Sequence, residues 1–178
     1  MRKLLTLKSL SLLAVAFLFS TVAFAQKKPQ ASPADSTSGT VAGSTIKIVY
    51  HSPSVKGRKI WGGLVPYDQI WRTGANEATI FITSKDIKIG GKTLPAGKYS
   101  LYTKPGEKEW SLIINSQTGQ WGIKDEKGTT TDDPAKDVLV TTVKPMKSKS
   151  FNERMKFEIT PSGFVLLWEN LAVPVTIK

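Results

Sequence analysis

Apolar and polar residues alternate in many short stretches of this sequence. Ile46, Ile48 and Tyr50 occupy every second position of one stretch, and Tyr99 and Leu101 do so in another. Side chains of a β-strand point alternately to the two faces of its sheet, so this pattern is typical of strands with one buried face. The pattern predicts strands at residues 46–51, 79–83, 87–89, 99–103, 110–114, 138–144, 155–159, 164–168 and 173–177.

Glycine and proline mark turns between these stretches. The sequence Pro-Gly-Glu-Lys at 105–108 separates 99–103 from 110–114 and predicts the clearest hairpin of the chain. No segment after residue 25 shows a long helical period, and residues 67–71 fit at most one helical turn. About eight or nine short strands at nearly regular spacing predict an all-β fold, either an antiparallel β-sandwich or a barrel-like domain.

The first 25 residues have a different pattern. Three basic residues precede an apolar run over 10–19, and the tripeptide Ala-Phe-Ala follows at 23–25. This layout predicts a secretory signal peptide at 1–25. A membrane anchor is the alternative, but the apolar run is about half of the ~20 residues that a spanning helix needs. We therefore expect an exported protein, periplasmic or extracellular, without stable membrane insertion after signal cleavage.

The mature chain is expected to have two parts. Residues 26–44 are rich in Pro, Ser, Thr, Ala and Gly, and their one large apolar side chain is Val41. Such a segment cannot bury enough apolar surface to fold, so we expect a flexible linker here. Residues 45–178 then form a single β-rich domain, which is long enough to enclose a hydrophobic core.

The composition excludes several classes of site. The chain has no cysteine and one histidine, which rules out disulfides, thiol nucleophiles and multi-histidine metal centres. We accordingly expect no metal and no cofactor. The formal net charge of +11 comes mainly from lysines that are scattered along the chain. Nucleic-acid binding normally needs a concentrated basic face, so we expect no nucleic-acid partner and interpret the lysines as a solvated surface.

Residues 51–77 interrupt the alternation and are the most distinctive part of the chain. This polar-aromatic segment contains the only histidine, two of the five tryptophans, and two of the three arginines that follow residue 44. A connection of this length inside a compact domain usually carries a function or its own packing. Both possibilities remain open from the sequence.

In the structural interpretation, aromatic residues of the segment plug one end of the sandwich, while Arg58, Arg72 and Glu77 form an internal ion network. In the functional interpretation, the arginines and an asparagine face a pocket with an aromatic wall. That chemistry suits a carbohydrate or a small anionic ligand. The candidate ligand-binding residues are Arg58, Trp61, Trp71, Arg72, Asn76 and Glu77.

Four sequence blocks resemble one bacterial family. They are SPSVKGRKIWGGLVPYDQIWRTGANEATIF at 52–81, IKIGGKTLPAGKYSLYTKPGEKEWSLIIN at 87–115, QWG at 120–122 and WEN at 168–170. On these residues the chain is similar to the domain of unknown function 2911 (DUF2911) family. The resemblance implies a secreted or periplasmic β-rich protein of Bacteroidota-type bacteria with no established activity. It supplies no catalytic residues that could be transferred to this chain.

The leading hypothesis is a non-catalytic ligand-binding module whose site is the 51–77 segment. One alternative is a hydrolase that uses Glu77 or His51 as its general base. The other is a purely structural or assembly domain. The structural alternative expects Glu77 to pair with Arg58 or Arg72 away from solvent. The binding hypothesis expects an open cleft beside these residues, and an enzyme needs Glu77 or His51 at the floor of that cleft.

Overall fold

The computed structural model describes residues 30–126 and 128–178, so the expected signal peptide lies outside the described residues. Residues 31–178 form one compact unit. Its described regular elements are β1 (Ala34–Val41), β2 (Ser44–His51), β3 (Thr79–Thr83), β4 (Ile87–Ile89), β5 (Lys92–Leu94), β6 (Gly97–Lys104), β7 (Trp110–Asn115), the 3₁₀ turn η1 (Pro134–Lys136), β8 (Asp137–Val143), β9 (Met146–Thr160) and β10 (Gly163–Thr176). Within the described residues, no helix has the length and apolar content needed to cross a membrane. The predicted all-β class is confirmed.

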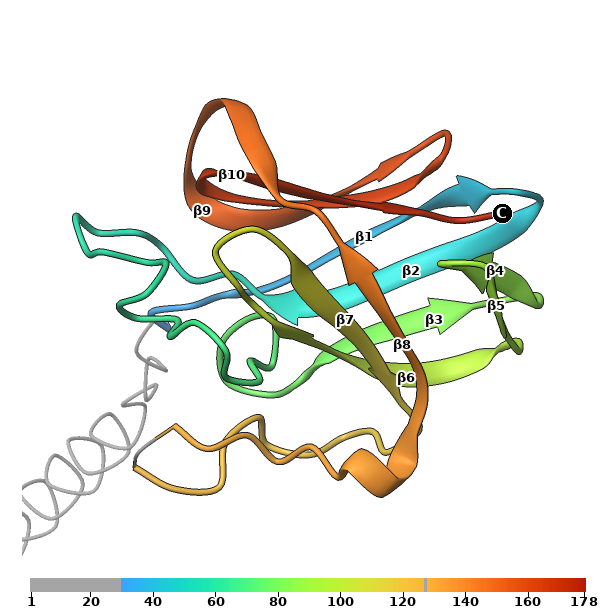
Figure 1. Cartoon of the computed structure of the whole chain (residues 1–178), viewed down its shortest axis with the longest axis horizontal. Coiled ribbons are helices and arrows are strands. Elements are labelled where there is room, and N and C mark those ends of the chain that lie inside the picture. The colour runs from blue at the N-terminus through green and yellow to red at the C-terminus, as the bar shows by residue number, and fades with distance from the viewer. Residues whose placement is uncertain (1–29, 127) are drawn as a thin grey trace, which may run out of the picture. The chain divides into compact units, whose positions relative to one another are not determined.

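Six strands form one antiparallel sheet in the order β1-β2-β3-β6-β7-β8 (Figure 1). The predicted hairpin around residues 105–108 is confirmed as β6 and β7, with Leu101 opposite Ile114. Every second residue of β2 is buried, so Ile46 and Ile48 face the core as the alternation predicts. The period of two therefore gave the correct inner face of β2, whereas β6 and β7 have runs of consecutive buried residues.

The second layer is built on the long β9–β10 hairpin, which lies over the sheet (Figure 1). Beyond the end of β10, the backbones of Lys88 and Lys178 exchange hydrogen bonds of 2.6 and 2.9 Å, which attaches β4 to the hairpin. On the other side, the N–H of Val55 donates to the carbonyl of Glu153 at 2.8 Å, so β9 also pairs with the start of the 51–77 segment. The predicted antiparallel sandwich is confirmed by these two facing layers.

The core lies between the layers. Phe81 of the sheet packs against Phe164 of β10 with ring centroids 5.7 Å apart, and Phe164 in turn packs against Phe157 of β9 at 6.1 Å. The strands predicted at 164–168 and 173–177 form one continuous strand, β10, with register shifts on both sides of Glu169. The bulge interrupts the alternation there, which is why the sequence pattern predicted two strands instead of one.

The prediction of a flexible linker at residues 26–44 is wrong for the second half of that range. Residues 34–41 form β1, which pairs with β2 along its whole length, from Ala34 opposite His51 to Val41 opposite Ser44. An edge strand can be held by backbone hydrogen bonds with little apolar surface, and here only Val41 is buried. A two-residue turn at Ala42 and Gly43, both with positive φ, closes this hairpin. The compact unit therefore begins near residue 31 and not at 45.

Tyr50 connects three strands. Its hydroxyl donates a hydrogen bond to Asp35 Oδ2 of β1 at 3.0 Å and accepts one from the backbone N–H of Phe157 in β9 at 3.2 Å. Burial, opposed in part by the Phe157 bond and reinforced by Asp35, raises the pKa of Tyr50 to about 12. The phenol therefore keeps its proton in the folded protein at pH values where the unfolded chain loses it.

We predict that this phenol makes the protein less stable at alkaline pH. Between the ordinary pKa of 10.0 and about 12, the unfolded state ionises while the folded state does not, so the free energy of unfolding falls as pH rises. Tyr50→Phe cannot ionise, so its free energy of unfolding should decrease less over this range. Urea denaturation at several pH values measures both curves. Parallel curves for the two proteins would contradict the prediction.

Four tryptophans form one packed cluster in the core. Trp61 lies against Trp71, Trp110 and Trp168, with ring centroids 5.9, 4.9 and 5.7 Å away. Trp71 and Trp168 are stacked at 5.7 Å. Two of these indoles come from the 51–77 segment, one from β7 and one from β10. The cluster thus attaches the segment to both layers of the sandwich.

Removing one indole from this cluster should destabilise the fold strongly. Trp110→Ala is expected to lower the free energy of unfolding by about 3–5 kcal/mol, because it leaves a large cavity among packed rings. Trp121→Ala is the matched control, since this tryptophan is 52% exposed and its loss should change stability by less than about 0.5 kcal/mol. Urea denaturation followed by far-ultraviolet circular dichroism measures both. Equal effects of the two substitutions would contradict the role of the cluster.

Candidate functional site

Backbone hydrogen bonds place the 51–77 segment against β6. Trp71 and Thr103 exchange two of them, with N···O distances of 2.7 and 3.0 Å. The N–H of Asp68 donates to the carbonyl of Pro105 at 2.7 Å. A segment without regular strands thereby gains fixed positions along the neighbouring hairpin, and the side chains that follow Trp71 are aimed by this anchor.

The turn after Trp71 has an unusual backbone. Thr73 and Asn76 have φ values of 54° and 58°, a left-handed conformation that is rare for a β-branched residue such as threonine. Thr73 is fully buried, and its hydroxyl lies 3.1 Å from the hydroxyl of Thr103. The indole N–H of Trp71 donates to the carbonyl of Gly74 at 3.1 Å. These contacts hold a strained turn in place, and such strain concentrates at functional sites.

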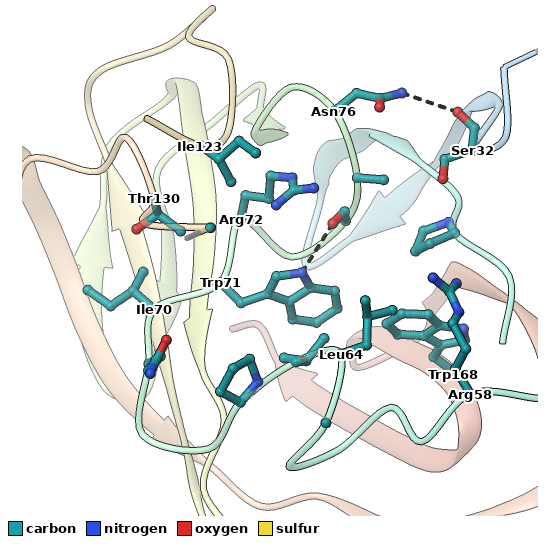
Figure 2. Close-up of a pocket in the computed structure, with 18 residues that line it drawn as sticks. Ser32, Arg58, Leu64, Ile70, Trp71, Arg72, Asn76, Ile123, Thr130 and Trp168 are labelled. Carbon is teal, nitrogen blue, oxygen red and sulfur yellow. Dashed lines mark hydrogen bonds between the residues drawn. The ribbon is translucent and has the colours of Figure 1, made fainter. Parts of the chain in front are cut away.

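A cavity of about 660 Å³ opens beside this turn (Figure 2). Its apolar wall includes Leu64, Val65, Ile70, Trp71, Ile123 and Trp168. Its polar lining includes Ser32, Arg58, Gln69, Arg72, Asn76 and Thr130. None of the described residues that line the cavity is acidic. The cavity therefore combines an apolar wall with two cationic side chains.

Arg72 is the most unusual of these side chains. Its Nε is buried without a hydrogen-bond partner, and none of the ion pairs among the described residues involves its guanidinium. Burial lowers the pKa of Arg72, although an arginine remains charged at neutral pH. The side chain crosses Gly122 so closely that a Cβ there would lie 1.9 Å from Arg72 Cδ. A partly desolvated cation without a counter-ion is costly, and an anion in the cavity would compensate it.

Arg58 and Asn76 line the cavity in different ways. Arg58 is exposed, and its guanidinium donates to the carbonyls of Ser54 and Val55. None of the ion pairs among the described residues involves Arg58. The amide of Asn76 donates to the carbonyl of Ser32 at 3.3 Å, as Figure 2 shows. Trp71, Arg72, Arg58 and Asn76 are thus brought to one cavity, as the functional interpretation of the segment expects.

Comparison with known proteins shows which family this chain belongs to. The family described as "Protein of unknown function (DUF2911)" matches residues 32–177. The chain belongs to this family. No curated protein and no solved structure matches the chain. The resemblance drawn from the sequence blocks is therefore confirmed, and in this DUF2911 domain the match begins just before β1, upstream of the first block at residue 52.

The ion network expected by the structural interpretation is absent from the described part of the DUF2911 domain. Glu77 pairs with His51, at 3.1 Å between Oε2 and Nδ1, and not with Arg58 or Arg72. Its side chain is 51% exposed, so the pair lies at the surface. Neither Glu77 nor His51 lines the cavity. The backbone explains this arrangement. The hydrogen bond from Ala75 N–H to the His51 carbonyl holds Ala75 beside His51, and Glu77 follows two residues later on the chain.

Trp61 also differs from its expected place. It belongs to the indole cluster in the core and does not line the cavity beside Arg72. The neighbour of His51 on the chain, Ser52, has its hydroxyl committed to the carbonyl of Met155 at 2.6 Å. No serine nucleophile therefore accompanies the surface His51–Glu77 pair at this position.

Several lining residues of the DUF2911 domain were not candidates from the sequence. Trp168 lies in a stretch that looked like an ordinary buried strand, although the WEN block already contained it. Ile123 and Thr130 come from a loop that backbone contacts bring to the turn, such as the 3.0 Å bond from Gly122 N–H to the carbonyl of Asn76. These are long-range contacts, and no local pattern indicates them.

Proposed function

We propose that this DUF2911 domain is an exported, non-catalytic module that binds a small organic anion in the cavity beside Arg72. The observation that carries the proposal is the partly desolvated Arg72 guanidinium, which has no acidic partner among the described residues and lines an apolar-walled cavity. A carboxylate fits this guanidinium well, because the planar fork of N–H donors matches two carboxylate oxygens.

The lining favours an anion over a carbohydrate, the other ligand class expected from the sequence. A sugar hydroxyl both donates and accepts hydrogen bonds, whereas arginine offers donors only. The two arginines of the cavity, with no acidic side chain beside them, create a positive potential that attracts negative charge. The broad apolar wall suits a ligand with an apolar body and not a fully hydroxylated one.

The two other functional hypotheses receive less support. A hydrolase with Glu77 or His51 as its base would need one of them at the cavity, but they pair with each other outside the cavity lining. A purely structural role accounts for the indole cluster and the buried Thr73 turn. It gives no reason for a partly desolvated arginine without a partner, because a neutral side chain would fill the same space at lower cost.

Export to the periplasm or the extracellular space is part of the proposal and has separate support. The basic start, the apolar run and the Ala-Phe-Ala tripeptide support it, because this order of regions is typical of a cleaved signal. A binding module outside the cytoplasm would meet small organic anions that enter from the environment. The ligand class and the compartment are therefore compatible with each other.

The proposal predicts that Arg72→Gln weakens ligand binding without weakening the fold. Trp71 and Trp168 line the cavity, so intrinsic tryptophan fluorescence can follow titrations with a panel of carboxylates and neutral glycans. A charged hydrogen bond contributes about 1.5–3 kcal/mol, so the substitution should weaken carboxylate binding roughly tenfold or more. The free energy of unfolding should stay constant or rise, because a partly desolvated charge is removed.

The matched control is Arg154→Gln. Arg154 is exposed, donates to the carbonyl of Ser52 at 3.4 Å and does not line the cavity. Arg154→Gln removes the same charge as Arg72→Gln, but away from the cavity. Ligand binding should therefore remain close to that of the natural protein. Equal binding by Arg72→Gln and the natural protein would overturn the proposal. Loss of folding in Arg72→Gln alone would instead favour the structural interpretation.

A further inference from the structure

We infer that the ligand carries two acid groups joined by an apolar body, with one acid group bound at Arg72 and the other at Arg58. This inference rests on the proposed function and specifies the class of anion. The second cation of the cavity, the buried N–H of Trp168 and the apolar side chains of the lining support it.

The two arginines occupy different parts of the cavity. Figure 2 shows Arg72 on one side of the Trp71 ring and Arg58 on another, and both arginines line the cavity. An anion with one acid group would compensate one guanidinium and leave the other to solvent. A ligand with two separated acid groups matches both positive charges.

The guanidinium of Arg58 is held in place and has free N–H donors for the second acid group. Its Nε donates to the carbonyl of Val55 at 3.1 Å, and one terminal nitrogen donates to the carbonyl of Ser54. These bonds fix the guanidinium at the end of the loop but leave other N–H donors unused. A fixed guanidinium loses less conformational entropy when it binds a carboxylate, so the contact is stronger than one to a mobile surface arginine.

Trp168 adds a further hydrogen-bond donor to the lining of the cavity. It is 1% exposed, lines the cavity, and has a buried Nε1–H without a hydrogen-bond partner. The other lining indole, Trp71, already donates to the carbonyl of Gly74. Trp61 and Trp110 also have an unpaired buried indole N–H, but of these three tryptophans only Trp168 lines the cavity. An unpaired buried N–H is costly, so a ligand oxygen that reached Trp168 would compensate it.

The lining of the cavity also has apolar side chains. Trp71 and Leu64 are among them, and Leu64 is 47% exposed although its side chain is large and apolar. A hydrocarbon or aromatic body would cover this surface on binding. Contact at both ends then links two weak interactions in one molecule, which raises affinity well beyond that of either end alone.

The experiment compares acids of equal carbon number. The protein is titrated with succinate, adipate, suberate and sebacate, and with butyrate, hexanoate, octanoate and decanoate, at one fixed ionic strength. Tryptophan fluorescence and calorimetry give the dissociation constants. We expect one length of dicarboxylate to bind at least about tenfold more tightly than the monocarboxylate of the same length. Shorter and longer dicarboxylates should bind less tightly than this optimum.

Three substitutions locate the second acid group. Arg58→Gln should remove the preference for the dicarboxylate and weaken monocarboxylate binding much less than Arg72→Gln does, whereas Arg72→Gln should weaken both. Trp168→Phe, which keeps a ring without the N–H, should weaken the dicarboxylate only. Lys59→Gln is the control, since Lys59 is exposed, adjacent to Arg58 on the chain and absent from the cavity lining.

The outcomes separate this inference from the proposed function. If monocarboxylates bind as tightly as every dicarboxylate, the inference is overturned and the anion-binding function stands. The same holds if folded Arg58→Gln and Arg58→Lys proteins show the same preference for the dicarboxylate. The charge at this position then does not affect the preference. If no acid of either series binds while a neutral glycan does, the proposed function itself is overturned.

Discussion

The packing of four indole rings is the contact on which the rest of this structure depends. Trp61 and Trp71 enter the cluster from the 51–77 segment, while Trp110 and Trp168 enter it from β7 and β10. Large aromatic rings dominate core energetics because each buries a large apolar area. This packing fixes a segment of more than two dozen residues without regular strands between the two layers. The cavity residues of the segment are therefore positioned by the same contact.

The cluster also explains why the arginines of the segment are available for another role. Loops of this length are often pinned by arginine–carboxylate pairs, yet Arg72 has no such partner among the described residues and Glu77 pairs with His51. The indoles and the buried Thr73 turn already provide the pinning. Arg72 is then held over Gly122 and lines a cavity with an apolar wall and no acidic residue among the described ones, an arrangement that favours a negative ligand.

Alternation in the sequence was sufficient for most of the fold because side-chain direction in a strand is a local property. It failed where stability came from elsewhere: β1 is held by backbone bonds to β2 and not by its own apolar side chains. Of the candidate site residues, Arg58, Trp71, Arg72 and Asn76 line one cavity. The sequence could not show that Trp61 packs in the core or that Trp168 reaches the cavity, because both depend on contacts between distant segments.

The most direct test of this account is the ¹H–¹⁵N NMR signal of the Arg72 Nε–H group during titration with a carboxylate that the protein binds. The sequence has four arginines, so few such signals compete. The account predicts that the Arg72 signal moves as the acid binds, while the Arg154 signal does not. An Arg72 signal that stays constant at saturating ligand, or that already reports a paired carboxylate in the free protein, would contradict the account.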